Sequence, residues 1–150
     1  AGYIIIRFHH FFDNKLGGSL HDVSGSRLSL LGQQTLSEME KRNIIVDLTH
    51  SSEPEVNEVL KLVKSSVVIS HTDLQGTCDS ARNISDALMK RVADKGGLIG
   101  IGFWKAAVCD HSPVGIVKTL RYAIDLLGEN HVALGSDFDG AFEPGSMFQS

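Results

Sequence analysis

The stretch IIVDLTH, residues 44–50, decides the fold of this chain, because it is a short apolar run that stops at a histidine. The same pattern returns in VVISH, residues 67–71, and in VALGSD, residues 132–137. Short apolar runs that alternate with helical patterns are typical of strands buried on both faces of a parallel sheet. Such sheets open at the carboxyl ends of their strands, where active sites lie. The sequence therefore directs His50, His71 and Asp137 to one edge of a sheet, which favours a metal-dependent hydrolase.

Strand and helix patterns alternate along the whole chain. We expect strands at residues 3–8, 44–48, 66–70, 98–103 and 132–135. Helices are expected between them, with Ser29, Ser52, Ser85 and Ser112 at or near their N-termini. Ser52 and Glu55 have the spacing of a reciprocal capping box. Two helices carry one-sided apolar stripes: Val56, Val59, Leu60 and Val63 in one, and Val117, Leu120, Ile124 and Leu127 in the other.

This alternation permits part of a (β/α) barrel or an open doubly wound sheet. No Gly-x-Gly-x-x-Gly motif follows the first strand, so a dinucleotide site has no support. No linker or low-complexity segment interrupts the pattern, so we predict one α/β domain over residues 1–150. A complete (β/α)8 barrel needs at least about 200 residues. A barrel built from this chain is therefore an incomplete one of about five βα units.

Composition excludes several classes of partner. The 150 residues are 42% hydrophobic and 21% charged, with a net charge of −4, which is ordinary for a soluble globular protein. The sequence has no cluster of Lys and Arg residues that would indicate nucleic-acid binding. No apolar stretch approaches the roughly 20 residues of a membrane segment. No signal peptide is visible, so a cytoplasmic location is favoured. Cys78 and Cys109 are expected to be reduced thiols, with one disulfide as the open alternative.

His50 and His71 close consecutive strands and lie 21 positions apart in the sequence. Adjacent parallel strands are about 4.8 Å apart, so two imidazoles at equivalent strand ends can share one metal ion. Imidazole suits zinc, but a catalytic zinc normally has three protein ligands. The pair is thus one ligand short. Two hydrogen-bonded polar residues at a sheet edge are the alternative interpretation.

Further polar side chains are expected at the same edge. Asp137 could bind a metal or move a proton, whereas Asp139 is ordinary turn material. His10 ends the first strand, and Arg82 could hold a substrate carboxylate through paired hydrogen bonds, or form a surface ion pair. Asp73 is interpreted as a loop residue despite its metal-ligand spacing from His71. The remaining histidines have no supporting context and are expected at the surface or in packing: His9, His21, His111 and His131.

Four motifs resemble those of the membrane (renal-type) dipeptidase family, the amidohydrolase-like zinc peptidases of family M19. They are DLTH at 47–50, ISHT at 69–72, Arg82-Asn83, and GSDFDG at 135–140. HFFDN at 10–14 resembles the family segment that carries a substrate-binding histidine. Order and spacing agree over almost the whole chain, and the motifs are specific in combination.

This resemblance implies a (β/α)8 barrel enzyme that hydrolyses dipeptides through a metal-bound hydroxide, with two zinc ions bridged by a carboxylate and a water. His50 and His71 would bind one zinc ion. His10 would polarise the substrate carbonyl, and Arg82 would hold the C-terminal carboxylate of the dipeptide. Asp137 would manage the proton that passes from the water to the leaving amine.

The resemblance also implies that part of the zinc centre is missing here. In the family, a His-x-Asp pair and a bridging glutamate precede the segment that matches this chain. The chain resembles the C-terminal part of a dipeptidase, holds at most one partial zinc site, and is expected to be poorly active alone. A catalytically inactive fragment or binding module, and an amidohydrolase-type enzyme for a cyclic amide or ester, are the alternatives. A homodimer is possible, as in many relatives.

Overall fold

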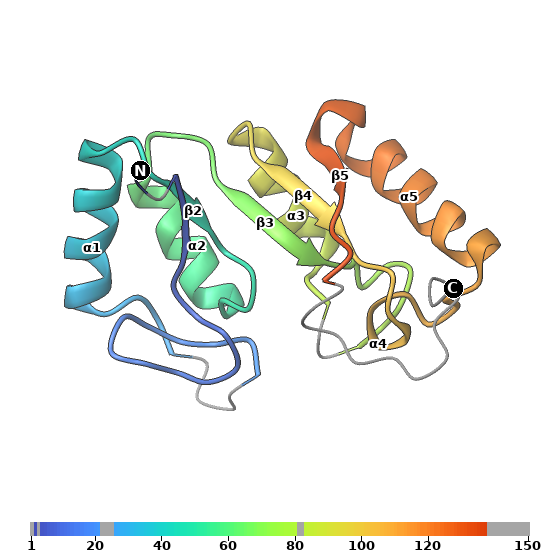
Figure 1. The fold of residues 1–150 in the computed structure, drawn as a ribbon, viewed down its shortest axis with the longest axis horizontal. Coiled ribbons are helices and arrows are strands. Elements are labelled where there is room, and N and C mark those ends of the chain that lie inside the picture. Colours follow the sequence, from blue (N-terminus) through green and yellow to red (C-terminus); the bar gives the residue numbers. More distant parts are fainter. Residues whose placement is uncertain (1, 3, 22–25, 81–82, 138–150) are drawn as a thin grey trace.

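The computed structural model describes residues 2, 4–21, 26–80 and 83–137. Its strands form one parallel sheet in which each strand pairs with its neighbour in the sequence (Figure 1). The strands are β1 (Ile5–Arg7), β2 (Ile45–Asp47), β3 (Val68–Thr72), β4 (Leu98–Ile101) and β5 (Val132–Leu134). The predicted α/β fold with five parallel strands is confirmed. Each strand except β3 is shorter than expected, and β3 extends past His71.

Helices connect the strands and form a layer along one side of the sheet. They are α1 (Leu30–Lys41), α2 (Glu53–Leu62), α3 (Asp86–Asp94), α4 (Lys105–Val108), α5 (Pro113–Leu127) and the 3-10 helix η1 (Glu129–His131). In Figure 1, α2 and α3 lie behind the strands, while α1 and α5 lie at the two ends. Helix α4 was not anticipated from the sequence. None of the described helices is long and apolar enough to span a membrane.

Serine residues begin the four longer helices as expected. Each serine hydroxyl accepts the backbone N–H of the residue three positions later, in the pairs Ser29–Gly32, Ser52–Glu55, Ser85–Leu88 and Ser112–Gly115. Only half of the predicted capping box is present. The Ser52 N–H donates to the Gly18 carbonyl, and the Glu55 carboxylate turns inward to bond His9. The reciprocal bond is therefore replaced by tertiary contacts.

The core lies between the helices and the sheet. The predicted stripe of α2 is fully buried. The stripe predicted for α5 holds for Leu120 and Leu127, which pack in the core, but is wrong for Val117, which is 63% exposed, and Ile124, which is 37% exposed. The buried positions of α5 include Gly115, Thr119 and Ala123. These small residues recur every four positions, so their face lets the helix backbone approach its neighbours closely. The large apolar residues Ile116 and Leu127 share this buried face.

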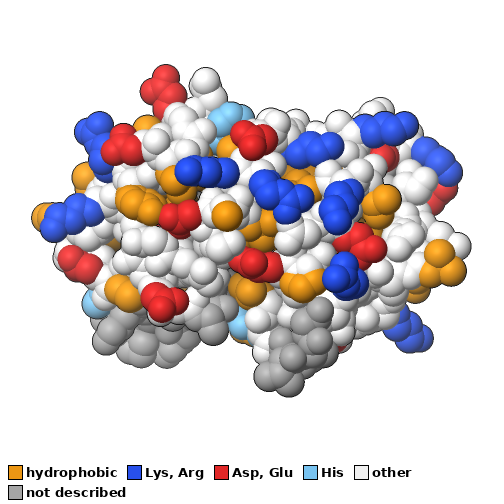
Figure 2. Space-filling model, turned by 180° about the vertical axis from the view of Figure 1, so that it is seen from behind, with side chains coloured by type: hydrophobic (Ala, Val, Ile, Leu, Met, Phe, Trp, Pro, Cys, Tyr) orange, Lys and Arg blue, Asp and Glu red, His pale blue; other side chains and the backbone are white. Residues whose placement is uncertain are grey.

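The opposite face of the sheet carries exposed apolar side chains. Ile5 and Ile45 pair across β1 and β2, and both are exposed, as is Leu98 in β4. In Figure 1 no described helix covers this face. On the helical side, Lys, Arg, Asp and Glu side chains are interspersed with apolar ones (Figure 2). A sheet with helices on one side only has the layout of a barrel wall, as predicted.

A disulfide joins Cys78, which follows β3, to Cys109, which ends α4. This corrects the expectation of two reduced thiols. Helix α4 brings Cys109 back over the β3–α3 connection, a return that the sequence pattern did not reveal. Asn83 reinforces the junction, because its side-chain amide donates to the carbonyls of both Cys78 and Ala107. The disulfide therefore joins two loops at the carboxyl end of the sheet.

Candidate metal centre and active site

His50 and His71 lie side by side at the carboxyl ends of β2 and β3. Their Nε2 atoms are 3.3 Å apart, and both side chains are buried. His71 belongs to β3 itself, whereas His50 follows β2 in the left-handed backbone region, with φ of 68°. Non-glycine residues adopt this conformation rarely, and it often marks functional sites. The turn at His50 aims its imidazole across the strand end toward His71.

The separation of the two Nε2 atoms suits a shared metal ion. Two imidazoles bound to tetrahedral zinc at 2.0–2.1 Å place their nitrogens about 3.4 Å apart. The observed distance matches that value, and imidazole nitrogen is a preferred zinc ligand. Within the described residues, no group of three or more His, Cys, Asp or Glu side chains is arranged to hold a metal. The described part of the chain thus offers two candidate ligands, one fewer than a catalytic zinc normally has.

Asp137 approaches the same pair from beyond β5. Its Oδ2 lies 3.6 Å from Nε2 of His71, and its backbone is also left-handed, with φ of 52°. Two glycines make this approach possible. A Cβ at Gly100 or Gly135 would lie 2.2 or 2.3 Å from the carbonyl oxygen of Ser70, so a side chain at either position would push the strands apart. The three strand ends therefore converge closely enough to share one site.

A chain of hydroxyl groups holds the second nitrogen of His71. Nδ1 of His71 lies 3.0 Å from the Ser70 hydroxyl, which lies 3.1 Å from that of Thr49. The Thr49 hydroxyl donates to the buried carboxylate of Asp47 at 2.7 Å. A metal-bound histidine usually donates its other N–H to such a partner. Asp47, Thr49 and Ser70, to which the sequence analysis gives no role of their own, therefore orient His71.

His21 lies against His50, which corrects its expected role as a surface or packing residue. Its Nε2 is 2.9 Å from Nδ1 of His50, and Phe11 contacts both rings. The signal was invisible in the sequence because His21 belongs to an irregular loop 29 residues upstream. Only the tertiary position of that loop brings the two rings together.

His10 lies at the opening of the site. It is exposed, and its ring centroid is 5.4 Å from that of His50. Arg82 and Asp139 lie outside the described residues, so their predicted roles stay predictions. Asp73 is fully buried, and burial raises its pKa to about 7, although one of its oxygens accepts the backbone N–H of Leu74. That contact agrees with its interpretation as a loop residue.

A second buried pair lies beside the site. Nε2 of His9 donates to both carboxylate oxygens of Glu55 at 2.9 Å, and the side chains of both residues are fully buried. The Ser51 hydroxyl also donates to Glu55. His9 precedes His10, and Ser51 follows His50, so this pair ties two segments of the site to α2. The sequence does not reveal this pair, because the spacing of Glu55 from Ser52 predicts a helix cap instead.

Comparison with known proteins identifies the family. The sequence profile of the membrane dipeptidases, peptidase family M19, matches residues 2–147. The chain belongs to this family. A dipeptidase of Aspergillus oryzae, aclJ, is 30% identical over 118 residues, which is 75% of this chain and 28% of that protein.

Solved structures of family members and related enzymes agree with the fold. A metallo peptidase of Rhodobacter sphaeroides, bound to a phosphinate mimic of the dipeptide L-Ala-D-Ala, is 28% identical and superposes with a TM-score of 0.74. The match covers 79% of this chain and 36% of that one. An amidohydrolase of Pseudomonas aeruginosa is 26% identical, with a TM-score of 0.81 and coverage of 93% and 44%. The chain thus spans less than half the length of these two proteins.

Proposed function

We propose that this chain supplies the His50–His71 half of the zinc centre of a dipeptidase. The observation that carries the proposal is the 3.3 Å separation of the two Nε2 atoms, which is suited to one tetrahedral ion. Membership of a metallopeptidase family supports the same conclusion. When bound, the metal would supply Lewis acidity toward the peptide carbonyl and lower the pKa of a nearby water.

The surrounding residues would act on the substrate itself. His10, exposed beside His50, would donate a hydrogen bond to the scissile carbonyl as negative charge develops on its oxygen. Asp137, next to His71, would take a proton from the attacking water and pass it to the leaving amine. Arg82 would hold the C-terminal carboxylate of the dipeptide through paired hydrogen bonds.

On this proposal the chain carries only part of the set of zinc ligands. The described residues offer two imidazoles, and the related proteins are more than twice as long. We therefore propose weak zinc binding and poor turnover for the 150-residue chain alone. The complete protein would add the remaining ligands.

The test uses the complete protein with a set of dipeptides. We expect hydrolysis that a chelator abolishes and zinc restores. His50→Ala should lose zinc and activity together, whereas His111→Ala, which removes an exposed histidine, should lose neither. Dipeptide hydrolysis that survives complete metal removal would contradict the proposal.

A kinetic variant tests the role of Arg82. Arg82→Met should raise KM for dipeptides far more than it lowers zinc content, because it removes a contact with the substrate and none with the metal. An unchanged KM would remove that role. Zinc binding without turnover by the complete protein would instead favour the inactive binding module.

A further inference from the structure

We infer that His21 is a positioning residue of the metal centre, which accepts a hydrogen bond from Nδ1–H of His50 and so keeps Nε2 of His50 available to the metal. This inference rests on the proposed function, since it takes His50 as a metal ligand. The contact that carries it joins Nε2 of His21 to Nδ1 of His50 at 2.9 Å. Nε2 of His50 faces away from this contact, toward His71.

The loop that carries His21 is bound directly to the segment around His50. The Leu20 N–H donates to the His50 carbonyl at 2.6 Å, and the Ser19 hydroxyl donates to the same oxygen. Ser19 and Ser51 form an antiparallel β-bridge. These backbone contacts bring the His21 side chain to His50 as a consequence of the fold.

A glycine allows the same loop to pack closely. A Cβ at Gly18 would lie 2.1 Å from the carbonyl oxygen of Ser26, so no other residue fits there without movement. The Gly18 carbonyl, in turn, accepts the N–H of Ser52 at the start of α2. The segment from Gly18 to His21 is therefore hydrogen-bonded both to the residues around His50 and to the start of α2.

The direction of the His21–His50 hydrogen bond follows from the chemistry of imidazole. A neutral imidazole carries one N–H, and only its unprotonated nitrogen can bind a metal. If His21 donated to Nδ1 of His50, the single proton of His50 would lie on Nε2 and block the metal. His50 must therefore donate, and Nε2 of His21 must accept.

The two proposed ligands then have separate orienting partners. His71 is held by the hydroxyl chain from Ser70 to Asp47, whereas His50 is held by a second imidazole. Phe11 encloses that imidazole pair, with ring centroids 5.1 Å from His21 and 5.5 Å from His50. Loss of His21 should weaken the hold on His50 and leave the support of His71 unchanged.

Cobalt binding to the 150-residue chain tests this role without relying on activity. Co²⁺ would be titrated into the wild type and into His21→Leu, His21→Gln, His50→Ala and His111→Leu, with affinity read from the visible absorption of the bound ion. We expect His21→Leu to bind about 10- to 100-fold more weakly than the wild type. His21→Gln should recover most of the affinity, because its amide oxygen can accept the bond. His111→Leu should match the wild type, and thermal melting of the metal-free variants should show that all of them fold.

The outcomes separate this inference from the proposed function. Equal cobalt affinity of the wild type and His50→Ala would overturn the proposed metal site. If His50→Ala loses binding but His21→Leu does not, the proposed site survives and the role of His21 is overturned. If His21→Gln binds as weakly as His21→Leu, the hydrogen bond is not what matters, and the positioning role is likewise overturned.

Discussion

At the scale of single residues, the buried pair of His9 and Glu55 ties the segments of His10 and His50 to α2. His9 precedes His10 in the sequence, Glu55 lies five positions after His50, and neither side chain reaches solvent. Nδ1 of His9 has no hydrogen-bond partner within the described residues, so the bonds to Glu55 carry the whole polar contact of this ring. A buried, hydrogen-bonded pair is costly to break by removing one partner.

Glu55→Leu is expected to lower the free energy of unfolding by about 3 kcal/mol, because it leaves the Nε2–H of His9 and the Ser51 hydroxyl buried without an acceptor. The double variant His9→Phe/Glu55→Leu should recover part of that loss, since it removes both polar partners. Urea denaturation of the wild type and the two variants measures the free energy of unfolding of each. A double variant less stable than Glu55→Leu would contradict this account.

Some residues of the site lie at the ends of predicted strands, and others do not. His50, His71 and Asp137 follow or end apolar runs, so their convergence was predictable from the order of parallel strands. His21 and the His9–Glu55 pair depend on where an irregular loop folds back, and neither spacing nor periodicity encodes that. Asp47 and Ser70 lie inside predicted strands and Thr49 directly follows one, but their hydroxyl chain depends on how β2 and β3 lie side by side.

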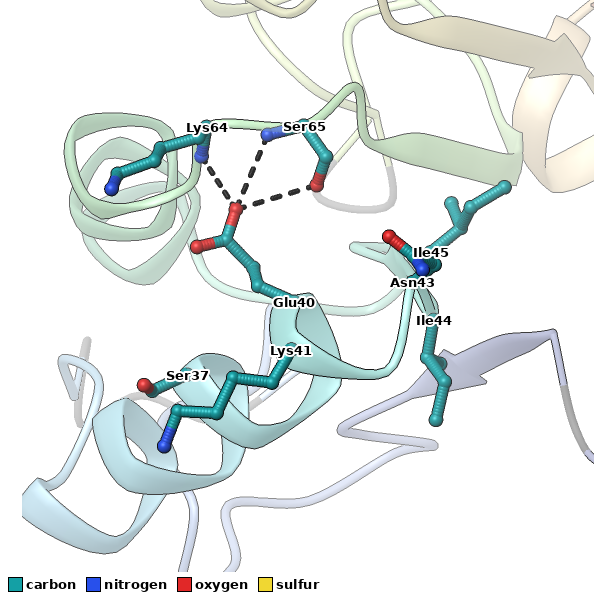
Figure 3. A pocket seen from close by; sticks show the side chains of 8 residues that line it. All are labelled: Ser37, Glu40, Lys41, Asn43, Ile44, Ile45, Lys64 and Ser65. Carbon is teal, nitrogen blue, oxygen red and sulfur yellow. Dashed lines mark hydrogen bonds between the residues drawn. The ribbon is translucent and has the colours of Figure 1, made fainter.

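At the scale of elements, Glu40 of α1 anchors the connection from α2 to β3. One carboxylate oxygen accepts the backbone N–H groups of Lys64 and Ser65 and the Ser65 hydroxyl, beside a hollow of about 600 Å³ at the amino end of the sheet (Figure 3). Partial burial acts to raise the pKa of Glu40, but these hydrogen bonds outweigh it and hold the pKa below the ordinary value. The carboxylate form is thus the one that the fold stabilises.

Glu40→Gln should lower stability at neutral pH by about 1 kcal/mol, since it weakens hydrogen bonds to a charged acceptor. The folded state lowers this pKa, so the contribution is present above the unfolded value near 4.5 and is lost as the pH falls through the folded value. The difference between the variant and the wild type should therefore shrink in acid. Glu38→Gln, which affects only the exposed pairs with Lys41 and Arg42, is the matched control and should change stability less. A constant difference from pH 7 to pH 3 would refute the role of the charge.

The disulfide between Cys78 and Cys109 closes a loop of 31 residues. Replacing both cysteines by serine should lower the free energy of unfolding by about 3–4 kcal/mol, according to the loop-closure model. Denaturation with and without reductant measures the loss of stability. Reductant should destabilise the wild type by a similar amount and should leave the variant unchanged. Identical unfolding of both proteins under oxidising conditions would contradict it.

Helices and strands were predictable where a periodic pattern of apolar residues or an N-terminal serine cap indicates them. The four serine caps and the buried face of α2 were read correctly because each rests on local spacing. The rotation of α5 and the existence of α4 were not predictable. The buried face of α5 mixes small and large residues, and α4 has only four residues and no stripe of its own.

At the scale of the whole molecule, both edges of the sheet are open within the described residues. β1 and β5 each pair on one side only, and Leu134 in β5 is 67% exposed. Open strand edges with apolar side chains favour association with other chains.

The isolated 150-residue chain is therefore expected to self-associate as its concentration rises. Leu134→Lys should reduce that association, because a charge on an edge strand opposes further pairing. Leu30→Lys is the control, since Leu30 is similarly exposed, at 72%, but lies on α1. Sedimentation velocity would measure both variants, and an equal effect of the two would show that general hydrophobicity, rather than the edge, drives association.

Because every strand of this sheet pairs with the strand that precedes it in the chain, each new βα unit can dock on structure already formed during synthesis. Such an order keeps contacts local and lets the barrel wall grow from one end, without waiting for distant segments. A cut in the connection between two units would then separate pieces that still carry matching edges. Two halves of a dipeptidase produced as separate chains should accordingly reassemble when mixed, with the zinc ligands divided between them.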